Sequence, residues 1–275
     1  MPQQLQNDVL LAARLSLRYG SKPAVLSDVA INIRRGEVLG LIGQSGSGKS
    51  TLALAILGLL DRKKVQAQGE LLFEGSDLMR QSERELRNLR GRKIALVLQS
   101  PLSSLNPALR IRTQLKEAWR AHASAAQSEC NRAIGAALES VSLPSTEEFL
   151  DKYPSQMSIG QAQRVLIAMA VMHRPALLIA DEATSALDVI TQSEILALFR
   201  KLNRNFGMAI FYISHDLASV AGICDRVAIL HEGQIVESGE TAHVLTNPQH
   251  SYTQRLMAAM PKLPQAAEAA KAAGV

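Results

Sequence analysis

Residues 43–50 constrain this chain most, because they read G-Q-S-G-S-G-K-S and match the pattern G-x-x-x-x-G-K-S/T. Residues 36–42 before them form a short apolar run, which is typical of a strand buried on both faces of a parallel sheet. Residues 49–60 after them form an apolar helical segment. Glycines let such a loop approach a phosphate closely, and its N–H groups and the helix N-terminus form a partly positive concavity. The sequence therefore predicts a phosphate-binding loop between a strand and a helix.

Two side chains of this loop carry specific chemistry. The Lys49 ammonium suits the β- and γ-phosphates of a nucleotide, and the Ser50 hydroxyl is placed for Mg²⁺. The strand before the loop and the helix after it disfavour the alternative of a chance glycine-rich turn. We expect nine consecutive residues to contact the nucleotide: Gly43, Gln44, Ser45, Gly46, Ser47, Gly48, Lys49, Ser50 and Thr51.

A pair of acids follows the apolar run at residues 177–180. Ligands of open α/β sheets bind at the C-terminal ends of the strands, where Asp181 and Glu182 are expected to lie. Asp181 suits a direct or water-mediated contact to Mg²⁺, and Glu182 suits polarisation of an attacking water. The alternative is that adjacent acids merely end a strand and start a helix. Together with the phosphate loop, the catalytic interpretation is favoured.

Length and composition limit the classes of protein that this chain can belong to. The 275 residues correspond to about two domains, or to one large α/β domain with an insertion. The longest apolar run, residues 51–60, is about half of what a bilayer-spanning helix needs, and we expect neither a signal peptide nor a transmembrane segment. Two distant cysteines, Cys130 and Cys224, suggest a reducing compartment. Aromatic residues are only 4%, so no nucleic-acid partner is expected despite the +5 charge.

The remaining pattern predicts a doubly wound α/β core with two additions. Residues 107 to about 156 are rich in Ala, Glu, Gln and Arg and contain no strand-like run, which indicates an inserted helical subdomain. The tail from Lys262 is low in complexity and is interpreted as a frayed helix. Nine strands are expected, seven at residues 10–20, 25–33, 36–42, 69–73, 93–98, 176–180 and 208–213 and two in a terminal hairpin at 226–237.

Four further motifs follow the phosphate loop in a fixed order. Gln99 ends a strand, residues 158–161 read Ser-Ile-Gly-Gln before a helix, residues 185–188 read Ser-Ala-Leu-Asp, and Ser214-His215 ends another strand. With the acidic pair, this set resembles the nucleotide-binding subunit of ABC transporters, over residues 10–261. The resemblance implies one nucleotide-binding domain across residues 1–275. Its fold is an ABC-type P-loop core with an N-terminal antiparallel β subdomain, a helical signature subdomain at about 107–165 and a C-terminal tail at about 246–275.

The resemblance also implies roles for single residues in ATP–Mg²⁺ hydrolysis. Tyr19 is similar to the aromatic residue that stacks on adenine, although a strand residue at a turn is the simpler alternative. Gln99 is similar to the residue that touches Mg²⁺ or water and senses the membrane subunit. His215 is similar to the histidine that contacts the γ-phosphate, so that Lys49, His215 and Glu182 form the catalytic set.

Other residues resemble positions that act across a dimer. Ser158, Gly160 and Gln161 are similar to the signature motif that faces the ATP held by the opposite subunit, and Asp188 to the residue that crosses the dimer interface. Ile159 replaces the first glycine of the usual Leu-Ser-Gly-Gly-Gln. A β-branched residue disfavours positive φ and adds bulk where backbone should meet phosphate. We therefore expect an asymmetric heterodimer, with a working homodimer as the alternative.

Two stretches, residues 90–107 and 247–256, are similar to the ATPases of dipeptide, oligopeptide and nickel importers. This resemblance implies a second, different ATPase subunit, two transmembrane permease subunits and an extracytoplasmic substrate-binding protein, with this chain peripheral at the cytoplasmic face of the membrane. Many such relatives hold an iron–sulfur cluster on C-terminal cysteines, which this chain lacks beyond Cys224. A soluble ABC ATPase of translation or DNA repair, a non-hydrolysing regulatory subunit and an exporter remain alternatives. The substrate (peptide, nickel or metallophore) stays open.

Overall fold

The computed structural model describes residues 8–123 and 126–259, and its centre is a six-stranded sheet with the order β10-β9-β3-β8-β7-β6. The strands from β9 to β6 run parallel, and β10 closes the edge antiparallel to β9. Strands β3 and β8 are buried along their whole length, as their apolar sequences require. The strand bounds are β3 Val38–Ile42, β6 Ile94–Val97, β7 Leu177–Asp181, β8 Ala209–Ser214, β9 Arg226–His231 and β10 Gln234–Glu240.

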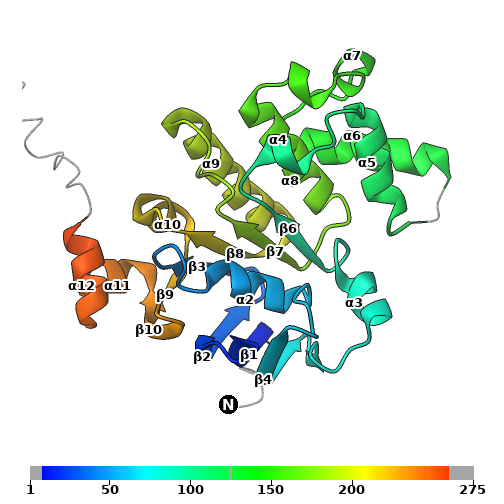
Figure 1. The fold of residues 1–275 in the computed structure, drawn as a ribbon. Coiled ribbons are helices and arrows are strands. Elements are labelled where there is room, and N and C mark those ends of the chain that lie inside the picture. The colour runs from blue at the N-terminus through cyan, green and yellow to red at the C-terminus, as the bar shows by residue number, and fades with distance from the viewer. Residues whose placement is uncertain (1–7, 124–125, 260–275) are drawn as a thin grey trace, which may run out of the picture.

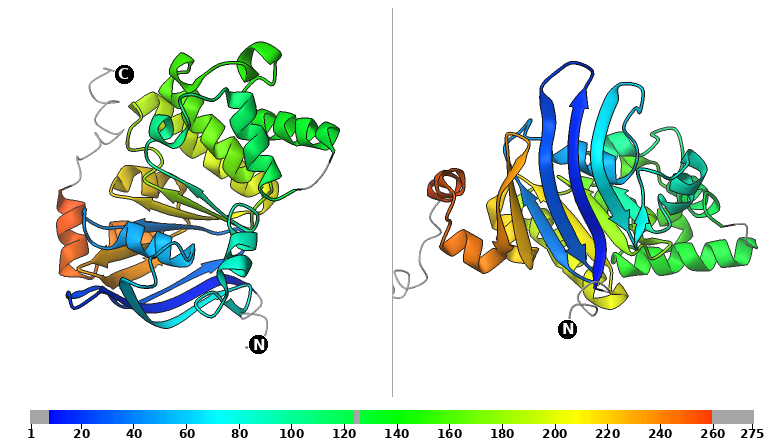
Figure 2. Two further views of the ribbon diagram at one scale, coloured as in Figure 1. Left: turned by 45° about the vertical axis from the view of Figure 1, so that its right-hand side comes forward. Right: turned by 90° about the horizontal axis from the view of Figure 1, so that it is seen from below.

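A second sheet is antiparallel and has the order β2-β1-β4-β5. Figure 2 shows its three long strands side by side, curving across one side of the molecule. Apolar residues of this sheet and of the parallel sheet pack around α2 in one continuous core. The bounds are β1 Val9–Tyr19, β2 Ala24–Arg34, β4 Val65–Phe73 and β5 Ser76–Asp77. The N-terminal antiparallel sheet and the α/β fold class are therefore confirmed.

Helix α2 spans Lys49–Ile56 and is shorter than the helix expected at residues 49–60. Gly58 ends it with φ +62°, a left-handed conformation that favours glycine. Its N–H donates to Ala55 O at 2.9 Å, and the N–H of Leu59 donates to Leu54 O at 2.9 Å. These two bonds form a Schellman motif, which satisfies the last carbonyls and turns the chain away.

Helices fill the chain between β6 and β7, and Figure 1 shows most of them gathered at one end of the molecule, beyond the edge strand β6. In the described part of residues 98–176 the structure contains no strand. The helices pack on each other and on the parallel sheet through a second apolar core. Their bounds are α4 Pro101–Ser104, α5 Ile111–Arg120, α6 Gln127–Ser140, α7 Glu147–Leu150, the 3-10 turn η1 Pro154–Gln156 and α8 Ile159–Val171.

The remaining helices complete the core and the C-terminal end of the described chain. Helix α9 follows the acidic pair, α10 links β8 to β9, and α11 and α12 follow the hairpin (Figure 1). The tail from Lys262, interpreted as a frayed helix, lies outside the described residues. Across 8–123 and 126–259, none of the helices is both long and apolar enough to span a bilayer. The bounds are α3 Glu83–Leu89, α9 Val189–Phe206, α10 Leu217–Ile223, α11 Thr241–Thr246 and α12 Ser251–Ala258.

Candidate functional site

The parallel sheet brings the expected site residues to one edge. Strands β3, β8, β7 and β6 are neighbours in that order and run parallel, so their C-terminal ends lie together. The phosphate loop follows β3, and His215 follows β8. Asp181 ends β7 with Glu182 just after it, and Gln99 follows β6 closely. Residues far apart in sequence are thus placed where ligands of open α/β sheets bind.

The phosphate loop is held close to the antiparallel sheet by a residue without a side chain. Gly48 caps α2 with φ +107°. A Cβ on Gly48 would lie 2.7 Å from Leu26 Cδ2 and 3.0 Å from Val25 O, which leaves no room for any other residue. The loop therefore delivers the N-terminus of α2, with its free N–H groups, to the sheet edge.

Lys49 is buried at the first position of α2 and points back along the loop. Its Nζ donates to Gly43 O at 2.8 Å and to Gln44 O at 3.0 Å, and it lies 4.0 Å from Glu182 Oε1. Burial lowers the pKa of Lys49, whereas the charges of Glu182 and Asp181 raise it. The ammonium is thus fixed between the loop and the acidic pair, where it can meet phosphate oxygens.

Asp181 and Ser50 form a donor set that fits Mg²⁺. The Ser50 hydroxyl acts to lower the pKa of the Asp181 carboxyl, and Asp181 Oδ1 is buried with no hydrogen-bond partner among residues 8–123 and 126–259. Burial raises the pKa of Asp181, and the Glu182 charge adds to this, against the effects of Ser50 and Lys49. Mg²⁺ prefers oxygen ligands such as a hydroxyl and a carboxylate, and a bound Mg²⁺ would give Asp181 Oδ1 a partner and stabilise the charge of the carboxylate.

Glu182 links the acidic pair to His215. Its Oε1 lies 3.3 Å from His215 Nδ1, and its N–H donates to Ile213 O at 2.9 Å on β8. The backbone of Glu182 has φ +50°, which is rare for a residue with a side chain and costs of order 1 kcal/mol. The His215 side chain is 59% exposed. The carboxylate therefore stands between the Lys49 ammonium and an accessible imidazole.

A buried polar layer beneath these residues was missed by the sequence reasoning. Thr184 Oγ1 and Tyr212 OH lie 2.8 Å apart in the interior, and they tie the segment after Glu182 to β8. Gln192 Nε2 donates to Asp216 Oδ2 at 2.7 Å, which ties α9 to the chain just after His215. The available signal was the tyrosine within the apolar run at 208–213, because a buried hydroxyl needs a partner.

The Ser-Ile-Gly-Gln motif starts α8. Ser158 Oγ accepts from Gln161 N at 3.2 Å, and Gln161 Oε1 accepts from Ser158 N at 3.2 Å, which is a capping box. Ile159 is the first helical residue and is 46% exposed. Because Ile159 is not among the positive-φ residues, the expectation that its β-branch would strain the backbone is wrong. Ile159 therefore differs from a glycine at this position through the size of its exposed side chain.

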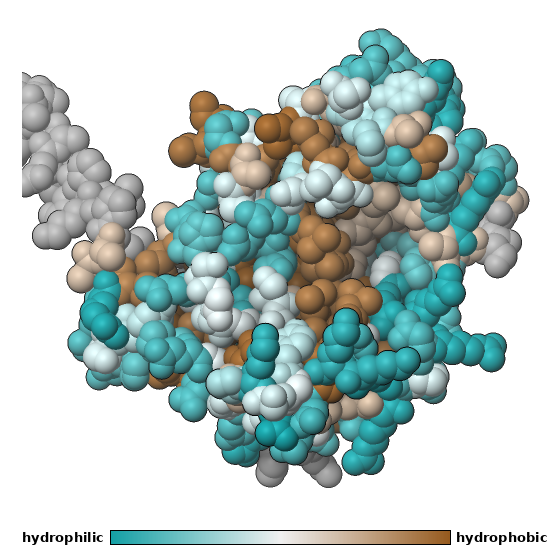
Figure 3. All heavy atoms as spheres, in the orientation of Figure 1, coloured by the Kyte–Doolittle hydropathy of each residue, from teal (hydrophilic) through white to brown (hydrophobic). Residues whose placement is uncertain are grey.

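The starts of α8 and α9 lie side by side and carry apolar surface. A Cβ on Gly160 would lie 2.8 Å from Thr191 Cγ2, so the two helices touch there. Val189 and Ile190 are 83% and 75% exposed at the start of α9, where Figure 3 shows apolar side chains gathered. Asp188 caps the same helix by accepting from Ile190 N at 3.1 Å and Thr191 N at 3.0 Å, and these bonds lower its pKa.

Contacts and electrostatic interactions join five of the predicted residues into one group: Lys49, Ser50, Asp181, Glu182 and His215. In the part of the chain that the structure describes, the other predicted side chains do not join this group. Tyr19 is half-buried at the end of β1 and packs on the apolar core, and Gln99 is exposed just beyond β6. Ser158, Gly160 and Gln161 lie at the start of α8.

Comparison with known proteins gives close relatives over most of the chain. The model of the ABC transporter family matches residues 26–185. The dipeptide transport ATP-binding protein DppD of Escherichia coli is 40% identical over 92% of this chain and 78% of its own length. The oligopeptide transport ATP-binding protein OppD of Bacillus subtilis is 39% identical over 91% and 70%. The glutathione import ATP-binding protein GsiA of Salmonella typhimurium is 38% identical over 93% of this chain and 42% of that protein.

Solved structures share the fold. The cbiO1 protein of Clostridium perfringens, part of an ABC transporter complex, has a TM-score of 0.77 and 28% identity over 87% of this chain and 92% of that chain. The ATP-binding cassette MJ0796, a dimer bound to ADP and Pi, has a TM-score of 0.71 and 27% identity over 84% of this chain and 98% of that chain. These relatives do not favour a translation or repair ATPase or an exporter. With the phosphate loop, acids and histidine at one sheet edge, the chain belongs to the ABC transporter family, as an importer ATP-binding subunit that hydrolyses ATP.

Proposed function

We propose that this chain energises the import of peptides, as one ATPase subunit of a complex at the cytoplasmic face of the membrane. The observation that carries the proposal is the 40% identity with a dipeptide transport ATP-binding protein over 92% of the chain. The relatives DppD, OppD and GsiA are named for dipeptides, oligopeptides and glutathione. Peptides are therefore favoured over nickel and metallophores as the cargo.

The binding step of the proposal uses the phosphate loop. The phosphates of ATP lie on residues 43–51, where the N-terminus of α2 and the buried Lys49 offset their charge. Ser50, Asp181 and Gln99 would hold Mg²⁺, which supplies charge stabilisation to the phosphate oxygens when bound. The unpartnered Asp181 Oδ1 supports this assignment. Tyr19 stacks on adenine.

The hydrolytic step uses the residues around Glu182. Its carboxylate accepts a hydrogen bond from the attacking water and orients it in line with the γ-phosphate. Lys49 and His215 offset the charge that develops on the γ-phosphate. The distances from Glu182 to His215 and to Lys49, 3.3 Å and 4.0 Å, support one concerted site for the three residues.

The partners of the proposal are a second, different ATPase subunit, two permease subunits and an extracytoplasmic binding protein. Ser158, Gly160, Gln161 and Asp188 would face the nucleotide of the partner ATPase. The exposed apolar side chains Ile159, Val189 and Ile190 support a protein contact at this surface. In this proposal, the bulk of Ile159 weakens the site that it completes on the partner.

The Ile159 part of the proposal is tested by an Ile159→Gly variant. Its ATPase rate is compared with wild type, alone and with the second ATPase subunit. We expect the ATPase rate to rise only in the complex with the second subunit, because a smaller residue lets the phosphate of the partner's nucleotide approach the start of α8. No gain in any arrangement would contradict the asymmetry. The cost of glycine at an exposed helix position, about 0.5–1 kcal/mol, is checked separately by thermal unfolding.

The function itself is tested by reconstitution in proteoliposomes with two permease subunits, the second ATPase subunit and a peptide-binding protein. A dipeptide-loaded binding protein is expected to stimulate ATP hydrolysis and peptide uptake together. The matched control is the same complex with Lys49→Ala. Stimulation by nickel or a metallophore, with none by peptides, would overturn the assignment of the cargo. A complex that does not form with any permease would overturn the transport role.

A further inference from the structure

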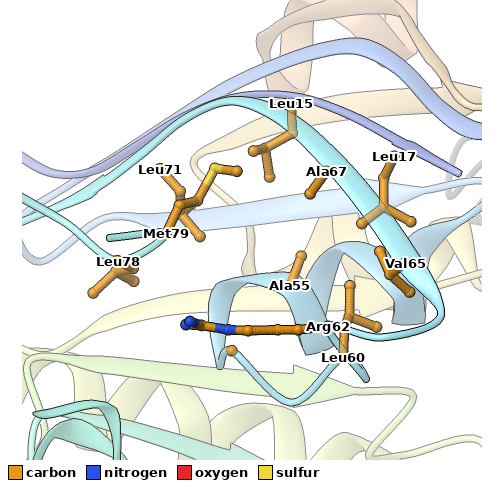
Figure 4. Close-up of a pocket in the computed structure, with 11 residues that line it drawn as sticks. Leu15, Leu17, Ala55, Leu60, Arg62, Val65, Ala67, Leu71, Leu78 and Met79 are labelled. Carbon is orange, nitrogen blue, oxygen red and sulfur yellow. The ribbon is translucent and has the colours of Figure 1, made fainter. Parts of the chain in front are cut away.

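A cavity of about 230 Å³ lies between the end of α2 and the antiparallel sheet (Figure 4). Figure 4 shows side chains from separate elements pointing into it: Leu15 and Leu17 from β1, Val65 and Ala67 from β4, and Ala55 from α2. None of its lining residues belongs to the candidate nucleotide site. The established activity therefore leaves this cavity without a role.

The interior of the cavity is apolar. Its deepest side chains, Leu15, Leu17, Leu71 and Leu78, are each 2% exposed, and Met79 covers one side. Water gains few hydrogen bonds in such a space, and an apolar cavity of about 150 Å³ is known to stay dry and to bind benzene. Scaled by volume, this cavity holds about nine non-hydrogen atoms of an aliphatic group.

The mouth of the cavity is positively charged. Arg62 lines the cavity, with its stem running beside the end of α2 in Figure 4, and its Nη2 donates to Gln81 O at 3.0 Å. The adjacent Lys63 and Lys64 are exposed, and Lys64 pairs with Asp61 at 3.5 Å. These four consecutive residues therefore carry three positive charges and one negative charge. The nearby Glu83 is already bound by Arg90.

An apolar interior beside a cationic mouth selects one chemistry. We propose that the cavity binds the chain of a medium-chain carboxylate, whose head group pairs with the Arg62 guanidinium. A chain of about eight carbons matches the volume, and a guanidinium suits a carboxylate because it donates two parallel hydrogen bonds. The proposal does not rest on the transported cargo or on the partner subunits.

The ligand would be sensed through α2. This helix has eight residues, lines the cavity with Ala55 and begins at Lys49 on the phosphate loop. A ligand that fills the cavity stabilises the end of the helix, since it binds the folded state alone. Octanoate is thus expected to raise the midpoint of thermal unfolding, a readout that needs no ATP and no partner.

Isothermal titration calorimetry of the full chain tests the proposal. Octanoate at about pH 7.5 is expected to bind saturably with a Kd of about 1 mM or tighter, and octylammonium at least about threefold more weakly. Arg62→Gln should weaken the binding of octanoate by about threefold to tenfold and leave the affinity for octanol unchanged. Ala67→Phe should abolish the binding of both compounds. Arg204→Gln, an exposed change on α9, is the matched control and should leave all affinities unchanged.

Methionine-methyl NMR keeps the test independent of variant folding. Octanoate should shift the Met79 methyl signal, while Met208, buried elsewhere in the core, stays unchanged. Octanoate that does not saturate, or that leaves Met79 unshifted, would overturn the cavity as a site. Equal affinity for octanoate and octylammonium would overturn the role of Arg62.

Discussion

At the scale of the residue, we propose that phosphate binding depends on Lys49. Its ammonium is held by two loop carbonyls, at 2.8 Å and 3.0 Å, so little reorganisation is needed when phosphate oxygens take their place. We expect Lys49→Ala to lower kcat for ATP by about 10²–10³-fold, the usual effect of removing one preorganised charge stabiliser. A steady-state phosphate-release assay on the purified complex measures this. Lys201→Ala, an exposed change on α9, should retain activity, and a Lys49→Ala rate within twofold of wild type would contradict the assignment.

Individual residues also show where sequence reasoning reaches its limit. The phosphate loop and acids could be predicted, because their residue types and spacing follow from phosphate and Mg²⁺ chemistry. The backbone conformation of Ile159 could not be predicted, because its φ depends on the residue at which the capping box starts α8. In the structure Ile159 is helical. The Thr184–Tyr212 bond was likewise hidden, since it joins residues 28 positions apart on different elements.

At the scale of the element, Asp188 has a role within its own chain. It caps α9 by accepting from two backbone N–H groups and from Thr191 Oγ1 at 2.7 Å. Asp188→Ala should therefore destabilise the protein by about 1 kcal/mol, whereas Asp188→Asn, an equally good cap, should be nearly neutral. Urea unfolding of the isolated chain separates the two variants. Equal stability of both would refute the cap, and a loss of ATPase activity in Asp188→Asn would support the interface role.

The elements were predictable where burial alternates or is complete, and less so elsewhere. Strands β3 and β8 were found because their apolar runs are fully buried. Strand β4 begins at Val65, four residues before the predicted start at residue 69. The sequence did not reveal this part of the strand, because residues 66–70 are exposed and show no alternation of buried and exposed side chains. Its pairing with β1, which the local sequence does not encode, extends it. The early end of α2 at Ile56 needs Gly58 in the left-handed conformation, a choice that a glycine permits but does not dictate.

At the scale of the whole molecule, a histidine cluster joins the helical region to the core. Trp119 stacks on His173 with ring centroids 4.8 Å apart, and His122 meets His173 edge-on at 5.4 Å. Burial lowers the pKa of His122 below 6.5, and His173, Arg92 and Arg87 lower it further. Burial also lowers the pKa of His173, and Arg92 adds to this effect. The backbone of Ala118 and Trp119 acts to raise this pKa but does not offset the effect of burial.

The sign of the resulting pH dependence follows from these lowered pKa values. The unfolded chain binds these protons near pH 6.5 and the folded chain only at lower pH, so stability is complete above about pH 6.5 and falls as the pH drops below it. We expect His173→Phe, which keeps the stack on Trp119, to reduce the drop in Tm between about pH 7.5 and 5.5. His243→Phe, an exposed change, should not. Identical pH profiles for wild type and His173→Phe would contradict the account.

For the whole molecule, we propose that ATP hydrolysis depends on Glu182, which lies between Lys49 and His215. The most direct measurement is ATP turnover and nucleotide retention by Glu182→Gln in the reconstituted complex. We predict that turnover falls by about 10²–10⁴-fold while ATP stays bound, because the amide keeps the shape of the carboxylate but cannot polarise the water. Glu139→Gln, an exposed change on α6, should behave as wild type. Normal hydrolysis by Glu182→Gln would contradict the account.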